Sequence, residues 1–222
     1  MRRRLMLAGA GAILFVQHPA LARAPRGLWF DPTQLPSFSG RLERWLMNPA
    51  GEIDRALLRE GVQIIFPPSE AEALVAAIAV DANFTAYGIR ARNAPVVTML
   101  AWAKNDTEAA NFVASPAWFA NESRGREELA IQGRIQAPLL TPQGEGMGAI
   151  LEDGNLIRLP VEAHEAMADR LKAGETVAAS GLGSRRENRM ALDAVRIGRT
   201  PDRLEPLPSP PPSAPAPAGR RP

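Results

Sequence analysis

Apolar and polar residues alternate with a period of two along several short stretches of this chain, and these stretches occur in the same order in each half. Such alternation is typical of β-strands that bury one face. In the first half it predicts strands over about 39–47, 54–59, 62–66, 83–90 and 96–103. In the second half it predicts strands over about 129–140, 147–151, 156–159, 176–181 and 190–197.

One short stretch of helical spacing separates the third and fourth strands of each half. In the first half, Ser69 is predicted to cap a helix, with Glu72 three residues later completing a capping box. Apolar residues then recur on one helical face up to Ile78. In the second half the helix is predicted over about 162–172, with Gly174 as its C-terminal cap.

The two halves are copies of one another. Residues 40–89 align without a gap on residues 133–182, at an offset of 93 positions. Identical pairs include turn and strand glycines and prolines: Gly40/Gly133, Pro49/Pro142, Gly51/Gly144, Gly61/Gly154 and Gly88/Gly181. The repeat favours two domains of the same fold over a chance alignment of unrelated β-rich segments.

The order of three strands, a helix and two strands resembles the OB-fold, a five-stranded and partly open barrel. The glycine inside the first strand fits that fold, because this strand must bend to join both sides of a small barrel. The repeated pattern G-R-[LI]…L-x-x-P-x-G-E…G…I-x-x-P resembles exported bacterial tandem OB-fold proteins, most of them without an assigned activity, over 40–103 and 129–198. This resemblance implies an all-β chain of two tandem OB-like five-stranded barrels with one helix per repeat. The alternatives are a single fused sheet and a different small barrel.

The chain is therefore predicted to contain two barrels between two terminal segments. The barrels are expected over 38–103 and 129–198, joined by a linker over 104–128 that holds a short helix near 107–113. The tail over 199–222 is rich in proline and is predicted to be disordered and extended.

Residues 1–22 are predicted to form an export signal. Three arginines at positions 2–4 precede a short apolar stretch over 5–16, and Ala20-Leu21-Ala22 provides a small-x-small cleavage site. An ordinary secretory (Sec) signal is favoured over a twin-arginine signal, which the Arg-Arg-x-Leu-Met order also resembles. The mature protein is expected to be periplasmic or secreted.

Charge and cysteine content narrow the function classes. Between Leu28 and Gly198 there are 17 Lys or Arg residues against 22 Asp or Glu residues, a net charge of −5, which is unlike a protein built to hold a phosphate backbone. Cysteine is absent, so the chain has no disulfide and no thiolate ligand or nucleophile. No cofactor, metal site or catalytic residue is predicted.

The sequence contains few residues suited to acid–base chemistry, and the positions of these residues favour structural roles. His164 is the one histidine beyond the signal and is predicted to lie exposed on the second helix. Glu52 and Glu145 occupy equivalent positions after the repeated Pro-x-Gly and could face each other across a twofold pseudo-symmetry axis. Their turn position favours local hydrogen bonds to the loop over an acid–base pair. We therefore expect no enzyme.

A cluster of arginines is the strongest candidate for ligand binding. OB-folds bind ligands across strands two and three, between the loops that join strands one and two and strands four and five. The second barrel places Arg185, Arg186 and Arg189 in the latter loop, and Arg158 points outward from its third strand. However, residues 129–198 contain no aromatic side chain on which nucleic-acid bases could stack.

These patterns lead to one functional hypothesis and one alternative. The hypothesis is an exported, non-enzymatic binding or scaffolding module of the bacterial envelope that contacts an acidic protein or an anionic glycan through Arg158, Arg185, Arg186 and Arg189. The alternative is a single-stranded nucleic-acid-binding OB-fold protein. In the first barrel, Trp45 has the opposite parity to Leu42 and Leu46, and is predicted to pack outward against the linker or the second barrel.

Overall fold

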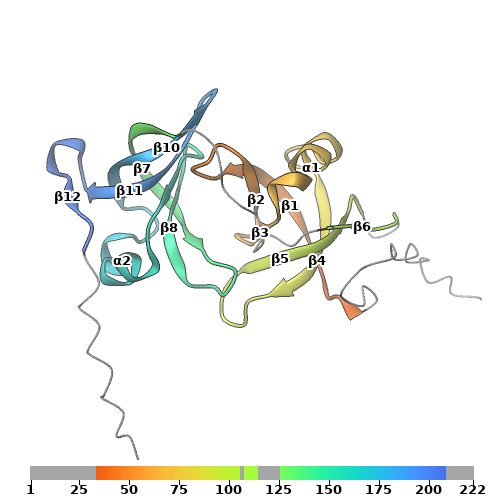
Figure 1. The fold of residues 1–222 in the computed structure, drawn as a ribbon. Helices are drawn as coiled ribbons and strands as arrows, with labels where there is room; N and C mark the ends of the chain where they lie inside the picture. The colour runs from red at the N-terminus through yellow and green to blue at the C-terminus, as the bar shows by residue number, and fades with distance from the viewer. Residues whose placement is uncertain (1–33, 106–107, 115–125, 209–222) are drawn as a thin grey trace, which may run out of the picture.

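The computed structural model shows two small β-barrels side by side (Figure 1). It describes residues 34–105, 108–114 and 126–208. The predicted export signal, the aromatic centre of the linker and the proline-rich residues 209–222 lie outside the described residues.

Each barrel is a closed ring of five strands. The first barrel comprises β1 (Ser37–Met47), β2 (Ile53–Leu58), β3 (Gln63–Ile65), β4 (Asn83–Arg90) and β5 (Val96–Ala103). The second comprises β7 (Glu127–Leu140), β8 (Gly146–Leu151), β9 (Leu156–Arg158), β10 (Thr176–Arg186) and β11 (Arg189–Gly198). In both, the first strand pairs with the second and fourth, and a parallel pairing of the third and fifth strands closes the ring. The predicted tandem OB-like pair of barrels is therefore confirmed.

The first strand of each barrel changes partner at the repeated glycine. β1 pairs with β4 up to Arg41 and with β2 from Leu42 onward, so Gly40 lies next to the point where the strand bends between the two sides. A Cβ atom at Gly40 would come within 2.5 Å of Leu58 Cδ1, and one at Gly133 would come within 2.9 Å of Leu151 Cδ1. At both glycines the bend brings the strand close to a leucine side chain of its neighbour, so a larger residue would require that leucine to shift.

The two helices are shorter than predicted. A 3₁₀ turn (Pro68–Glu70) leads into α1 (Ala71–Ala77), whose N-cap residue is Glu70 and makes no side-chain capping bond, so the predicted Ser69 capping box is wrong. α2 (Val161–Ala166) is followed by a separate 3₁₀ turn (Ala168–Arg170). Gly174 has a φ of +88°, but it lies in a later turn and does not cap α2.

The segments beyond the barrels differ from the prediction. The described part of the linker contains no helix between residues 108 and 113; it forms β6 (Asn111–Phe112), which pairs with β5. After a 3₁₀ turn (Pro201–Arg203), β12 (Glu205–Pro206) pairs with the end of β11. The tail is thus structured as far as Pro208, and only residues 209–222 remain predicted as extended.

Trp45 belongs to the core of the first barrel, contrary to the prediction. Its ring packs edge-on against Phe66, with ring centroids 5.8 Å apart at 84°. The cause is a register shift in the pairing of β1 with β2 between Leu42 and Arg44, which places one extra residue in β1. Such a bulge reverses the alternation beyond it, so Trp45 turns inward and Leu46 turns outward.

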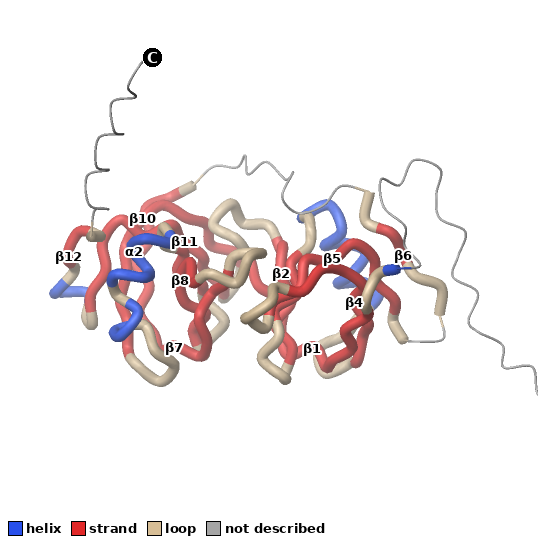
Figure 2. Tube along the Cα trace, turned by 90° about the horizontal axis from the view of Figure 1, so that it is seen from below, coloured by secondary structure: helices blue, strands red, loops and turns tan. Residues whose placement is uncertain are grey.

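The outward residues after this bulge join the two barrels, which lie next to each other in two perpendicular views (Figures 1 and 2). Their contact contains two apolar clusters, both fully or almost fully buried. One cluster comprises Leu46, Met47, Leu57, Leu139, Ile150, Leu156 and Ala191, and the other comprises Ile65, Val96 and Leu140. Burial on this scale fixes the barrels to each other.

Candidate ligand-binding cleft

The contact between the barrels covers part of the surface that OB-folds use for ligands. Leu57 on β2 and Ile65 on β3 project outward from the first barrel into the contact, and Ile150 on β8 and Leu156 on β9 do so from the second. In each barrel the second and third strands form that ligand surface. The contact therefore buries part of the OB ligand surface of each barrel, while Met147 on β8 and Arg158 on β9 line a separate open cleft.

A side-chain amide ties the two barrels together within this contact. Gln63 on β3 is 1% exposed. Its Oε1 accepts hydrogen bonds from Arg55 Nη1 at 2.7 Å and from the backbone N–H of Leu140 at 3.2 Å, while its Nε2 donates to the Pro138 carbonyl oxygen at 2.8 Å. The amide thus forms hydrogen bonds with one backbone N–H and one backbone carbonyl of β7. A neighbouring β-strand would bond to the same kinds of group.

Arg55 is a buried cation held by neutral acceptors. It is 6% exposed, and its Nη1 also donates to the Leu140 carbonyl oxygen at 2.8 Å. Burial is the main cause that lowers the pKa of Arg55 to about 10, with Asp54 acting in the opposite direction. The guanidinium therefore remains charged at neutral pH. Its hydrogen bonds to these acceptors offset the free energy that is lost when the charge leaves water.

Equivalent residues meet across the contact, which indicates an approximate twofold axis. Glu43 and Gln136 are related by the 93-residue offset, and Gln136 Nε2 donates to Glu43 Oε1 at 2.7 Å. Leu46 and Leu139, also related by that offset, lie in the same apolar cluster. Both barrels thus present the same surface to each other.

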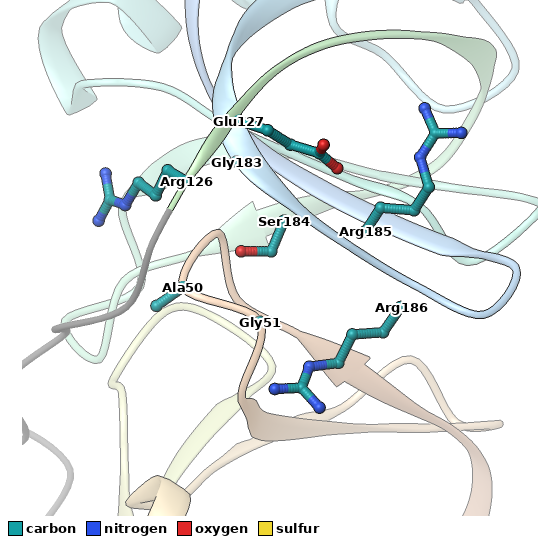
Figure 3. A pocket seen from close by; sticks show the side chains of 8 residues that line it. All are labelled: Ala50, Gly51, Arg126, Glu127, Gly183, Ser184, Arg185 and Arg186. Carbon is teal, nitrogen blue, oxygen red and sulfur yellow. The ribbon is translucent and has the colours of Figure 1, made fainter.

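One hairpin breaks this symmetry and forms a cleft. β10 runs three residues beyond the equivalent of the end of β4, so the β10–β11 hairpin extends past its barrel. There it reaches the turn after β1, where Ser184 Oγ donates to the Pro49 carbonyl oxygen at 2.8 Å. The result is a cleft of about 660 Å³ between the barrels, lined by Ala50, Gly51, Arg126, Glu127, Gly183, Ser184, Arg185 and Arg186 (Figure 3).

The four predicted ligand-binding arginines fall into two groups. Arg185 and Arg186 are exposed and line the cleft. Arg189 instead donates to the Trp45 carbonyl oxygen at 2.9 Å, which makes it part of the contact between the barrels. Arg158 donates to both carboxylate oxygens of Asp193, at 2.5 and 2.9 Å, and lies outside the residues that line the cleft.

Arg126 is the cleft residue that the sequence analysis missed. It lies at the very end of the predicted linker, and its Nη1 donates to Asp193 Oδ2 at 2.6 Å. The same carboxylate therefore holds Arg126 and Arg158, one on the cleft and one on β9. No local signal marks Arg126, because its position depends on where β7 begins relative to the extended hairpin.

The backbone N–H groups of Glu52 and Glu145 bond within their own turns. The backbone N–H of Glu52 donates to Asn48 Oδ1 at 3.0 Å, and that of Glu145 donates to Thr141 Oγ1 at 3.1 Å.

His164 is half-buried, contrary to the expectation of an exposed surface residue. Its Nε2 is buried and has no hydrogen-bond partner among the described residues. The imidazole lies against Gly146, where a Cβ atom would come within 2.0 Å of the ring Cε1 atom. Burial lowers the pKa of His164 from its ordinary value of 6.5, and nearby Glu165 opposes this only in part.

We expect His164 to make the protein less stable on acidification. Because its pKa is lower in the folded than in the unfolded state, the unfolded chain binds the proton more readily. The free energy of unfolding should therefore fall as the pH drops through 6.5 toward the folded pKa. Chemical denaturation on either side of that pH checks this, and His164→Gln should flatten the dependence in this range. An equally steep dependence in the variant would assign the effect to other groups.

Comparison of the chain with protein-family models, curated proteins and solved structures finds no match. Among the residues that the structure describes, no three His, Asp or Glu side chains come together in a way that could hold a metal ion. No helix within the described ranges is long and apolar enough to cross a membrane.

Proposed function

We propose that this protein is an exported, non-enzymatic binding or scaffolding module of the bacterial envelope, related to the tandem OB-fold proteins that its repeat resembles. Its partner is a protein that presents acidic side chains to the cleft between the barrels. The proposed export rests on the charged, apolar and small-x-small order of residues 1–22.

The observation that carries the proposal is the position of Arg185 and Arg186. Both guanidinium groups are exposed on a hairpin that one barrel extends over the other. Arg126 lies on the same concave surface, and Glu127 is the one acidic side chain among the described residues that line it. A concave surface with an excess of positive charge attracts acidic groups in an otherwise acidic protein body.

The alternative of single-stranded nucleic acid is supported less well. Part of the surface on which OB-folds bind strands of nucleic acid is covered in each barrel by the other barrel. Among the described residues that line the cleft, none is an aromatic on which a base could stack.

Binding of labelled acidic polypeptide tests the proposal. We expect poly-glutamate to bind the purified protein in fluorescence anisotropy, with an affinity that weakens as salt is added. Arg185→Gln combined with Arg186→Gln should weaken this binding by about tenfold or more, with a change in folding stability within about 0.5 kcal/mol. Arg90→Gln with Arg92→Gln removes the same charge from the equivalent loop of the first barrel and serves as the matched control.

Two other probes decide between partner classes in the same assay. A sulfated glycan that binds more tightly than poly-glutamate, and loses binding in the Arg185/Arg186 variant, would replace the protein partner with an anionic glycan. A single-stranded oligonucleotide that binds most tightly would restore the nucleic-acid alternative. Equal binding of poly-glutamate by the wild type and both variants would contradict the proposed surface.

A further inference from the structure

β9 and β12 share one edge of β11 and run toward each other along it, while β10 pairs with the other edge. The parallel pairing with β9 ends at Asp193, which lies opposite Arg158. From the other direction, the backbone N–H of Leu207 donates to the Val195 carbonyl oxygen at 3.3 Å. Only Ala194 lies between these two pairings, so the chain beyond Leu207 cannot continue along the edge and leaves it where β9 ends.

An open cleft of about 410 Å³ lies at this meeting point, and most of its lining is apolar. It is lined by Met147, Arg158, Leu159, Pro160, Val161, Asp193 and Ala194. Met147 belongs to β8 and Arg158 to β9, so the cleft is a part of the OB ligand surface that the first barrel does not cover. The two charged residues in its described lining, Arg158 and Asp193, are paired with each other. A cleft of this kind suits an uncharged and apolar segment.

The sequence that follows Pro208 has the matching chemistry. Residues 209–218 are Ser-Pro-Pro-Pro-Ser-Ala-Pro-Ala-Pro-Ala, without a charged side chain. Such a sequence favours the polyproline II conformation, so it loses little conformational entropy when its proline rings pack on an apolar surface. The cleft that holds Arg185 and Arg186 offers no such match, because its charges attract acidic groups and residues 209–222 contain none.

We propose that residues 209–218 bind in this cleft of their own chain and cover a part of the OB ligand surface that the first barrel leaves open. Leu207 packs against the core of the second barrel, so the segment starts from a fixed point beside the cleft. A tethered segment has an effective concentration of about 1 mM at a site within its reach, so a Kd of about 0.3 mM would keep the cleft occupied about three-quarters of the time. This inference goes beyond the proposed function, and it leaves the cleft with Arg185 and Arg186 to the acidic partner.

Oxidation of methionine by hydrogen peroxide reports whether the cleft is covered. Met147 is half-buried and lines the cleft, whereas Met190 is half-buried outside it and serves as the internal control. We expect Met147 to be oxidised about threefold faster or more in a chain that ends at Pro208 than in the full chain, because the truncation uncovers its thioether. The rate at Met190 should stay unchanged. Mass spectrometry of peptides from both proteins measures the two rates.

A full-length variant separates recognition of proline from the mere presence of a tail. It keeps the length and charge of the chain and combines Pro210→Ser, Pro211→Ser, Pro212→Ser, Pro215→Ser and Pro217→Ser. We expect Met147 of this variant to be oxidised as fast as in the truncated chain, because the rings that pack on the cleft are gone. A Met147 protected as well as in the natural chain would reject the proline contact.

Three other outcomes would also overturn the inference. Equal oxidation of Met147 in the full and truncated chains would mean that the tail does not cover the cleft. Faster oxidation of both methionines on truncation would mean that the tail stabilises the whole barrel and has no specific site in the cleft. Protection of Met147 that is lost on dilution, in a protein that elutes as a dimer, would assign the bound tail to a second copy of the chain. The binding of poly-glutamate is measured separately, so failure of this inference leaves the proposed function in place.

Discussion

Replacing Gln63 with alanine should lower the free energy of unfolding by about 3 to 5 kcal/mol. The change removes the acceptor of a buried guanidinium and leaves two backbone groups of β7, the Leu140 N–H and the Pro138 carbonyl, without this partner. A buried polar group that loses its partner costs about 1 to 3 kcal/mol, and more when it is charged.

Equilibrium denaturation measures this loss, and two variants make it specific. Gln132→Ala removes an exposed glutamine from β7 and should change stability by no more than about 0.5 kcal/mol. Arg55→Met combined with Gln63→Ala should cost less than the sum of the single changes, because the buried charge is removed with its acceptor. A loss below about 1 kcal/mol for Gln63→Ala would mean that apolar contacts alone hold the barrels together.

Gly181→Ala should destabilise the second barrel by at least about 3 kcal/mol. A Cβ atom there would lie 1.9 Å from the carbonyl oxygen of Asp193 on the neighbouring strand. Backbone atoms inside a closed ring of strands have little freedom to move aside, so the ladder between β10 and β11 must open. Gly88 is its repeat partner in the first barrel, and an added Cβ atom there would lie 2.0 Å from the Thr98 carbonyl oxygen. Gly88→Ala should therefore destabilise the first barrel to a similar extent.

Gly61 provides the control for this prediction. It has a φ of +78°, but no atom would lie within 4 Å of an added Cβ. Gly61→Ala should therefore cost only the conformational penalty of about 1 to 2 kcal/mol. Thermal or chemical denaturation of the three variants compares the two costs, and a Gly181→Ala protein as stable as Gly61→Ala would contradict the steric argument.

The repeat and the strand periodicity predicted most of the fold. The bounds of β4 and β5 agree with the prediction to the residue, because turns and prolines mark both ends of these strands. Strand periodicity placed Trp45 on the wrong face, because a single bulged residue reverses the order of inward and outward side chains. No local signal in the sequence marks that residue. The same bulge turned Leu46 outward and so concealed the surface on which the barrels meet.

The candidate site was only partly predictable, for a related reason. Arg185 and Arg186 follow from their place in a hairpin, and the structure finds both on the cleft. Arg189 and Arg158 have the same charge, yet Arg189 is engaged by the contact between the barrels and Arg158 by Asp193. Which arginine remains available depends on tertiary pairing that a linear pattern does not contain.

The hydrogen bond between Glu43 and Gln136 also determines which barrels recognise each other. Two first barrels meeting in this arrangement would bring two Glu43 carboxylates to the distance at which the native amide donates, 2.7 Å. Like charges this close repel, and one carboxylate would have to take up a proton. At this position a first barrel therefore fits a second barrel better than a copy of itself, because a single substitution between the repeats replaces a carboxylate with an amide donor.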